Sequence, residues 1–512
     1  MTVPSADLSI ADGVREFAVA SPGVTAVIDG DRTLTYAELD DRSSRLANAL
    51  ADAGLAPGDR VAVLLGNRLE YPEVAAGIAK AGCCMVPVNP RLTATEVAYI
   101  LGHSSATALV LDAALADIAG PGLDEHAITT VFEVDESTGS TYEAALAAAS
   151  PVDPRAPIDE REPFCITYTS GTTGNPKGVM ISHRSRALTF YAAALEWGLG
   201  PGTTTIAVAP MYHGAGFAFA YAAVHTGGTV AMLRSWDPTA FLQMVADVRP
   251  DSVFLVPAHA HMLRQLGDDV IAGFDTSSLS TVYFNAAPLP QNLKEWFLDT
   301  FPHVGAHELY GSTEAGIVSN LRPPDMRRKE VCVGPPWFMT QVRLVDGDGN
   351  VVEGAGEGEL FSRSPFLMNG YLDDDAATKA CTTPDGFLTS GDIARRDEDG
   401  HLYIIDRVKD LIITGGSNVY PREVEEVVAT HESVSEVAVI GLSDDQWGEA
   451  VTACVVLAPG AVLDEAALDA HARASLGGYK VPKRWVVVDA LPRNAAMKIL
   501  KRDLRTSLED AR

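Results

Sequence analysis

The chain has 512 residues, of which 47% are hydrophobic, and its formal net charge is -29 at pH 7. One hydrophobic core rarely serves so long a chain, so at least two domains are expected. The negative charge argues against a surface that binds nucleic acid or anionic membranes, because both need clustered cations, but it does not exclude nucleotides, whose phosphates a few local amides and cations can hold.

Short β-branched runs alternate with helical patterns through the first part of the chain. Strands are predicted at 61–65 and 107–111, with an amphipathic helix at 71–81 between them. A second helix is predicted at 93–101, capped by Thr93 or Thr95 and with Glu96 in its first turn. Further strands are predicted at 164–168, 253–256 and 281–284. This alternation indicates α/β layers with mainly parallel sheets.

Residues 197–233 contain no Asp, Glu, Lys or Arg, a length that would suffice for a membrane span. Pro201, Pro210 and several glycines interrupt the segment, so a buried strand, a turn and a helix explain it better. The N-terminal residues lack the basic and apolar regions of a signal peptide. We therefore expect a soluble, cytoplasmic protein without a membrane span.

Near residue 340 the pattern changes to short strands between Gly/Asp turns, predicted at 341–345, 358–361 and 401–406. A compact α+β tail follows, with a helix at 421–430 that has Pro421 at its first position, strands at 435–441 and 450–457, and a helix from Asp464. The expected fold class is α/β, with a large N-terminal domain at 1–408 that includes a β-rich subdomain at about 335–408, and a small α+β C-terminal domain at 409–512.

The cysteines favour neither a structural zinc site nor a redox pair. None of them forms a C-x-x-C motif, and no histidine cluster accompanies them at zinc spacing. Buried, reduced thiols are expected at Cys83, Cys84, Cys165, Cys332, Cys381 and Cys454.

The segment 168–178 has the chemistry of a phosphate-binding loop. It holds four hydroxyl groups of Ser and Thr, three glycines and Lys177, between the strand at 164–168 and a helix near Ser182. Glycines let backbone N–H groups point at an anion, hydroxyls add donors and lysine adds charge. It is not a Walker A loop, because Pro176 and Gly178 stand where that motif has Gly and Ser/Thr. On composition alone, a polar surface loop is the alternative.

This loop resembles the signature loop of the adenylate-forming superfamily, which includes acyl-CoA synthetases, peptide-synthetase adenylation domains and luciferases. Further segments resemble the family's motifs in the expected order: 310–314 (YGSTE), 390–392 (SGD), 406–410 (DRVKD), 415–421 (GGSNVYP) and 492–499 (PRNAAMKI). The likeness covers about residues 30–505 and points to the branch of AMP-forming acid:CoA ligases. It implies that a carboxylic acid and ATP form an acyl adenylate and pyrophosphate, and that CoA then takes the acyl group and releases AMP.

The resemblance assigns roles around ATP and Mg²⁺. Glu314 is the expected magnesium ligand, Thr313 the donor to the α-phosphate, and Tyr310 the ring on which adenine stacks, while Asp392 and Arg407 bind the ribose. The leaving phosphates are assigned to Thr169, Ser170, Gly171, Thr172, Thr173, Gly174 and Lys177. The remaining nucleotide-site residues implied are Asn285, Ala286, Ala287, Pro288, Glu308, Leu309, Gly311, Ser312 and Ile404. The family often has Gly at the position of Asn285, so the pocket is expected to be narrower or more polar there.

The tail domain is expected to deliver Lys498, whose ammonium bridges the incoming carboxylate and the α-phosphate. Met497 stands where the family normally has Gly, which puts the efficiency of this step in doubt. The resemblance implies a mobile tail that rotates at a hinge, Lys409, and replaces Lys498 by the loop containing Gly415 and Gly416.

Three further assignments concern the thiol and the acid. His213 is similar to the family's aromatic gate near the acyl carboxylate, and Trp447 to the residue that meets pantetheine. Lys480 and Lys483 are either contacts for CoA phosphates or ordinary surface lysines.

The segment 214–220 is expected to line the acyl site. Phe217 and Phe219 offer apolar walls, and no acidic residue there would pair with a substrate ammonium. Asp237 fits a helix cap better than a ligand. An apolar acid is favoured, either a fatty acid or a bulky aryl or terpenoid acid.

Other acceptors and activities remain open. The acceptor could be a separate acyl carrier protein in place of CoA, and Met497 leaves a nucleotide-binding protein with weak catalysis as an alternative. A luciferase-like oxygenase is a remote third option. Neither the oligomeric state, monomer or homodimer, nor the pathway follows from the sequence.

Overall fold

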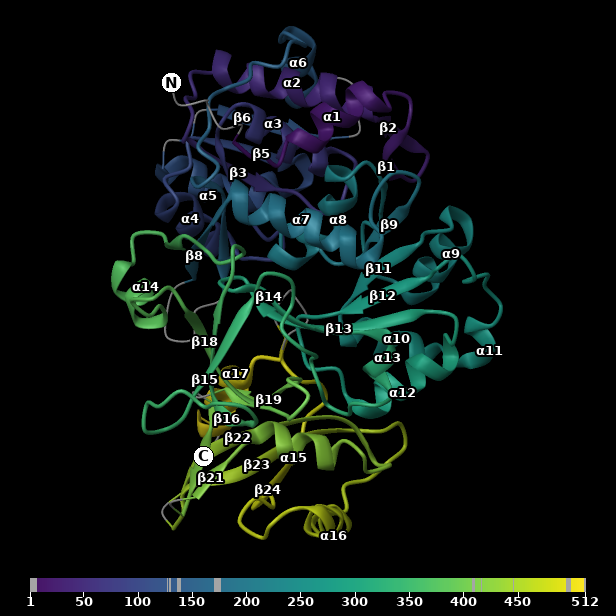
Figure 1. Cartoon of the computed structure of the whole chain (residues 1–512), viewed down its shortest axis with the longest axis vertical. Coiled ribbons are helices and arrows are strands. Elements are labelled where there is room, and N and C mark those ends of the chain that lie inside the picture. The colour runs from purple at the N-terminus through teal and green to yellow at the C-terminus, as the bar shows by residue number, and fades with distance from the viewer. Residues whose placement is uncertain are drawn as a thin grey trace.

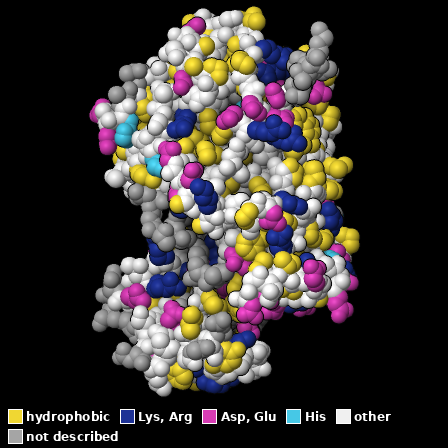
Figure 2. Space-filling model, turned by 60° about the vertical axis from the view of Figure 1, so that its left-hand side comes forward, with side chains coloured by type: hydrophobic (Ala, Val, Ile, Leu, Met, Phe, Trp, Pro, Cys, Tyr) yellow, Lys and Arg dark blue, Asp and Glu magenta, His cyan; other side chains and the backbone are white. Residues whose placement is uncertain are grey.

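The computed structural model describes residues 7–126, 128, 130–135, 140–169, 176–407, 410–415, 417–444, 446–493 and 499–510. A large lobe contains two main sheets with helices between and around them, and a smaller lobe built from the residues after 410 lies below it in Figure 1. Positive and negative side chains are interspersed on the face shown in Figure 2.

The first main sheet consists of β1 (Thr25–Asp29), β2 (Arg32–Thr35), β9 (Thr204–Ala207), β10 (Thr229–Met232), β11 (Ser252–Leu255), β12 (Thr281–Phe284), β13 (Gly305–Ser312) and β14 (Gly316–Leu321). Its strand order is β14-β13-β12-β11-β9-β10-β1-β2. The inner strands run parallel, and β2 and β14 pair antiparallel at the two edges. The predicted strands at 253–256 and 281–284 are β11 and β12.

The second main sheet consists of β3 (Arg60–Leu64), β4 (Cys84–Pro87), β5 (Ala108–Asp112), β6 (Thr130–Val134), β7 (Pro163–Thr169), β8 (Lys177–Ser182) and β17 (Gly370–Tyr371), in the order β17-β8-β7-β4-β3-β5-β6. Strands β3 to β7 are parallel, but β8 is antiparallel to β7. The sequence predicted a strand, a loop and a helix here. The prediction missed β8, because its residues 177–182 were assigned to the approach to the helix.

The helices of the large lobe are α1 (Asp12–Ala20), α2 (Tyr36–Asp52), α3 (Glu70–Lys80), α4 (Ala94–His103), η1 (Ala113–Leu115), α5 (Ala116–His126), α6 (Thr141–Ala148), α7 (His183–Trp197), α8 (Gly214–His225), α9 (Pro238–Val248), α10 (Pro257–Leu266), α11 (Asp268–Ile271), α12 (Gln291–Thr300), α13 (Pro323–Met326) and α14 (Asp375–Cys381). Side chains of α7 and α8, among them Phe190 and Phe217, belong to one core with residues of both main sheets. Two predicted caps are confirmed: Thr93 forms a capping box with Glu96 at α4, and Asp237 caps α9.

Helix α3 was predicted as amphipathic, and this was wrong. Every residue from Glu70 to Lys80 is buried. Arg42 Nε of α2 lies 2.6 Å from Glu73 Oε2, and Lys80 Nζ lies 2.6 Å from Asp40 Oδ1, again on α2. The charged positions of the pattern therefore face partners on α2 instead of solvent, since a buried charge needs a counter-charge.

A third sheet consists of β15 (Gln341–Val345), β16 (Gly356–Arg363), β18 (Leu388–Arg396) and β19 (Leu402–Arg407), all antiparallel. The small lobe holds β20 (Ile412–Thr414), β21 (Ser417–Val419), β22 (Val434–Asp444), β23 (Gly448–Leu457) and β24 (Arg484–Val487), with α15 (Pro421–Val428), α16 (Glu465–Ser475) and α17 (Lys501–Asp510). Arg422 joins the lobes, because its backbone N–H donates to Asp406 Oδ2 at 2.9 Å and its Nη1 to the carbonyl of Ile404 at 2.9 Å. Mixed α/β architecture, with a large and a small lobe, confirms the predicted fold class. The domain boundary at Lys409 stays a prediction, since that residue lies outside the described part of the chain.

The charge-free segment 197–233 folds as predicted into buried regular structure, namely β9, α8 and β10. No helix in the described part of the chain is long and apolar enough to cross a membrane. Five of the cysteines are buried and Cys381 is half-buried, all as free thiols.

Candidate active site

The proposed phosphate loop connects β7 and β8, which pair antiparallel. Thr169, at the end of β7, pairs directly with Lys177 at the start of β8. Lys177 Nζ lies 3.1 Å from Asp374 Oδ2 and 4.9 Å from the centre of the Tyr371 ring. Ser170, Gly171, Thr172, Thr173 and Gly174 lie outside the described residues, so their roles stay predictions.

Tyr371 connects the base of this loop to the proposed magnesium ligand. Its hydroxyl donates to Glu314 Oε1 at 3.0 Å. Among the described residues, no partner is recorded for Glu314 Oε2, and a free carboxylate oxygen is the ligand type that Mg²⁺ prefers. Glu314 lies in the tight connection between β13 and β14. Near the end of β13, Gly311 is required because a Cβ on it would lie 2.1 Å from the Gly316 carbonyl oxygen. The residues thus fit a bound Mg²⁺.

Asp392 forms hydrogen bonds with two other residues that are proposed to bind the nucleoside. Its Oδ2 accepts from the Tyr310 hydroxyl at 2.5 Å, and its Oδ1 from Arg407 Nε at 3.0 Å. Burial and the neighbouring carboxylate of Asp392 raise the pKa of Tyr310 well above its ordinary value, so the phenol keeps its proton. Ser390 Oγ donates to Ser312 Oγ at 2.9 Å, which ties β18 to the end of β13.

His213 and Gly214 begin α8 beside the proposed α-phosphate donor. A Cβ on Gly214 would lie 3.9 Å from Thr313 Oγ1. His213 Nε2 is buried and has no partner in the described part of the chain. Burial, and to a smaller extent the charge of Arg91, lowers the pKa of His213 to about 4, so the imidazole is neutral near pH 7.

The segment 285–288 follows β12 in a constrained conformation. Ala286 has a left-handed φ of 73°, and its backbone N–H donates to Asn285 Oδ1 at 2.6 Å. The Asn285 side chain therefore accepts a hydrogen bond from the backbone of its own loop. A non-glycine residue in the left-handed conformation costs about 1 kcal/mol or more. Ala287 and Pro288 continue this loop toward α12.

Three predicted nucleotide-site residues direct their polar groups elsewhere. Glu308 is buried and pairs with Lys294 Nζ of α12 at 3.1 Å. Leu309 packs in the core, and the Ile404 carbonyl accepts from Arg422. Their assignment to the nucleotide site stays a prediction. Any contact with the nucleotide would have to come from their backbone or from apolar atoms.

In the small lobe, Gly415 and Trp447 are in direct contact. The Gly415 N–H donates to the Trp447 carbonyl at 2.7 Å, and a Cβ on Gly415, whose φ is 57°, would lie 3.1 Å from the indole ring. The indole is 39% exposed, with Lys483 Nζ 5.6 Å from its centre. Lys480 pairs with Glu423 at 2.6 Å. The predicted residues Lys409, Gly416 and Lys498 lie outside the described part of the chain.

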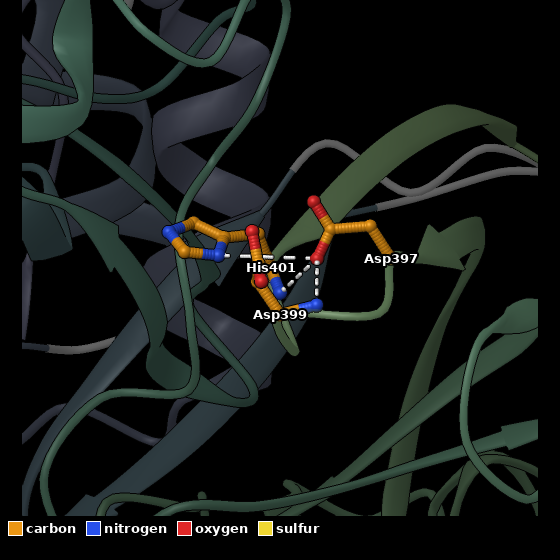
Figure 3. A group of neighbouring side chains, drawn as sticks. All are labelled: Asp397, Asp399 and His401. Carbon is orange, nitrogen blue, oxygen red and sulfur yellow. Dashed lines mark hydrogen bonds and ion pairs between the residues drawn. The ribbon is translucent and has the colours of Figure 1, made fainter.

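A second group of metal-type ligands lies in the turn between β18 and β19, where Asp397, Asp399 and His401 cluster (Figure 3). Lys329 Nζ lies 2.7 Å from both Asp397 Oδ2 and Asp399 Oδ2, and His401 Nε2 lies 3.2 Å from Asp325. A lysine between the two carboxylates supplies the positive charge that a metal ion would supply. We interpret the group as an ion-pair cluster that fastens β19 to α13.

Sequence reasoning missed Tyr371, Asp374 and Lys294. Each contacts a predicted residue only through folding, over separations of 14 to 197 positions, so no local pattern could have indicated them.

Comparisons with known proteins agree with this geometry. Residues 14–372 match the AMP-binding enzyme family, and residues 423–498 match the AMP-binding enzyme C-terminal domain. A feruloyl-CoA synthase from Amycolatopsis sp is 36% identical over 487 residues, which cover 95% of this chain and 96% of that protein. The fatty acid–[acyl-carrier-protein] ligase ScoC from Streptomyces coeruleorubidus is 34% identical, covering 94% and 93%.

Among solved structures, ATP-bound MatB from Rhodopseudomonas palustris aligns with a TM-score of 0.90 at 29% identity, covering 98% of this chain and 100% of that one. The match spans both lobes, and the family model alone covers more than half of the chain. The chain belongs to the AMP-binding enzyme family and is an adenylate-forming ligase.

Proposed function

We propose that this enzyme activates a carboxylic acid with ATP and Mg²⁺ and transfers the acyl group to the thiol of coenzyme A. The observation that carries the proposal is the convergence of two short chains of contacts at the end of β13. Lys177, Tyr371 and Glu314 form one, and Tyr310, Asp392 and Arg407 form the other. Tyr310 and Glu314 are four residues apart, so groups suited to phosphates and to a ribose lie next to each other.

In the first half-reaction, a carboxylate oxygen attacks the α-phosphorus of ATP, and the bond to the β-phosphate oxygen breaks to release pyrophosphate. Both reactants are anions, so charge neutralisation is the main catalytic demand. Thr313 donates to the α-phosphate, Lys177 lies beside the leaving phosphates, and Lys498 neutralises the charge that develops at phosphorus. Mg²⁺ held by Glu314 would add positive charge at the phosphates.

In the second half-reaction, the CoA sulfur attacks the acyl carbon, and the bond to the adenylate oxygen breaks to release AMP. Gly415, Trp447 and the neutral His213 are proposed to guide the thiol. Rotation of the tail at Lys409 would exchange Lys498 for the Gly415 loop between the two steps.

A separate acyl carrier protein is the second candidate acceptor, because a relative of similar identity is named a fatty acid–[acyl-carrier-protein] ligase. Both acceptors present a pantetheine thiol, so the exposed Trp447 suits either. The feruloyl-CoA synthase supports CoA as the first choice and an acid with an apolar body.

A panel of carboxylic acids tests the proposal through two readouts. Acid-dependent exchange of labelled pyrophosphate into ATP reports the first half-reaction, and AMP release with CoA or with a carrier protein reports the second. We expect exchange with at least one acid, and AMP release that CoA accelerates. No exchange with any acid would contradict the proposal, and acceleration by the carrier protein alone would replace CoA as the acceptor.

A further inference from the structure

Arg186, in the first turn of α7, is a half-buried cation that has no counter-charge among the described residues. Its Nε is buried and has no hydrogen-bond partner, and no ion pair involves the guanidinium among the residues that the structure describes. Burial lowers the pKa of Arg186 from its ordinary value, and the Cys165 thiol is the neighbour that acts against this. Arginine nevertheless keeps its proton in proteins, so the site holds an unpaired positive charge.

Two buried arginines of the described chain have carboxylate partners. Arg68 is 6% exposed and lies 2.7 Å from both Glu70 and Asp112. Arg422 is 9% exposed and lies 2.9 Å from Glu426. Arg186 is more exposed than these two arginines, but its Nε is buried without a hydrogen bond. A buried polar group without a partner is unfavourable, which makes this nitrogen a reason to look for a ligand.

Arg186 lines a small pocket together with the proposed gate of the active site. The pocket is lined by polar residues, among them His213 and Thr167, and by apolar residues, among them Met85, Met211 and Phe217. His213 Nε2 is also buried without a partner, so two unsatisfied nitrogens line one pocket. Such a wall suits an apolar spacer with hydrogen-bond acceptors at its ends.

Strand β7 relates the position of this pocket to that of the phosphate loop. Cys165 and Thr167 lie on one face of β7, with Cys165 Sγ 3.6 Å from Thr167 Oγ1, and the strand ends at Thr169, where the phosphate loop begins. At the rise of an extended strand, Cys165 lies about 13 Å before Thr169. Arg186 and Cys165 line the same pocket as Gly214, and Gly214 lies beside Thr313. An acid whose reacting carboxylate is at Thr313 would thus extend toward Arg186.

We propose that Arg186 selects acids that carry a second carboxylate at the far end of an apolar spacer, and that it binds this distal group through its guanidinium. Carboxylate is the anion that matches the planar guanidinium fork in a bidentate manner. The inference rests on the proposed acid activation and names the substrate class: an α,ω-dicarboxylic acid of intermediate length. One carboxylate is adenylated, and the other stays ionised on Arg186.

Pyrophosphate exchange with paired acids tests this assignment. Straight-chain dicarboxylic acids of increasing length are each compared with the monocarboxylic acid of the same carbon number, in the wild type, in Arg186→Met and in Arg184→Met. Arg184 is the matched control, because it is on the same helix turn but exposed, and pairs with Glu160 at 2.6 Å. In the wild type, kcat/KM should favour one dicarboxylic acid over its partner by about 10- to 100-fold, the scale of a charge-assisted hydrogen bond.

Arg186→Met should remove this preference and leave or raise activity with the monocarboxylic acid, while Arg184→Met keeps the preference. The inference is overturned if the wild type favours monocarboxylic acids at every length, or if Arg186→Met lowers both classes equally. Should Arg186→Met fail to fold by circular dichroism, Arg186→Lys offers the same comparison, with a reduced preference expected. Exchange with monocarboxylic acids alone would refute this inference but keep the proposed function, whereas no exchange with any acid would refute both.

Discussion

Replacing Asp392 by Asn should weaken ATP binding far more than acid binding. The Asp392 side chain is 5% exposed, and its two oxygens already accept from Tyr310 and Arg407, which leaves lone pairs for both ribose hydroxyls. Each hydrogen bond to a charged acceptor contributes about 1.5–3 kcal/mol, so loss of both ribose bonds would cost about 3–6 kcal/mol. Asparagine retains one acceptor, and we therefore expect the KM for ATP to rise about 100-fold.

The assay is pyrophosphate exchange with varied ATP at saturating acid. Replacing ATP by 2′-deoxy-ATP should weaken the wild type markedly and change the Asp392→Asn enzyme little, a readout that a purely structural role would not alter. Tyr310→Phe, which removes one bond to the carboxylate but keeps the aromatic face, should raise the KM for ATP by only about 10-fold. A KM for ATP within about threefold of the wild type in folded Asp392→Asn would refute the ribose assignment.

Three further predictions concern the metal, the gate and the ion-pair cluster. Glu314→Gln should raise the Mg²⁺ concentration for half-maximal exchange by about 10-fold or more, because an amide is a poorer ligand for a hard cation, whereas Tyr371→Phe should change it little. The pKa of His213 is lowered to about 4 by burial, so His213→Asn should leave the shape of the pH–rate profile unchanged between pH 6 and 8, and loss of an inflection near 6.5 would contradict this. Burial alone would raise the pKa of the Asp397 carboxyl. Hydrogen bonds to it, of which the one from Lys329 has the largest effect, lower its pKa to about 2. That stabilisation is present above about pH 4 and lost as the pH falls toward 2, so Lys329→Met should lower the Tm at pH 7 but not near pH 2.

The sequence predicted the elements that depend on local chemistry. Thr93 with Glu96, and Asp237, mark helix starts that the structure confirms, since a cap is formed within one turn. Strands such as β12 were predicted at their observed bounds because buried parallel strands are short apolar runs between turns. The motif order also gave residues from distant segments, Tyr310, Asp392 and Arg407, that the fold brings into contact.

What the sequence could not predict depends on tertiary partners. Glu73 and Lys80 of α3 are charged residues that the sequence predicted to face solvent, but α2 supplies counter-charges that allow them to be buried. Tyr371 and Arg186 belong to no motif, and their positions follow from how β17 pairs with β8 and how α7 packs on β7. An arginine whose Nε is buried without a partner can be recognised only when its neighbours in the fold are known.

Separate measurement of the two half-reactions in Lys498→Ala tests whether a lysine of the tail lobe completes an ATP site built on the large lobe. The first half-reaction is followed by pyrophosphate exchange, and the second by thioester formation from chemically prepared acyl adenylate and CoA. We expect exchange to fall by at least about 100-fold, because a charge aimed at the transition state is lost, while thioester formation stays within about threefold of the wild type. Exchange at the wild-type rate, or an equal loss in both half-reactions, would contradict it.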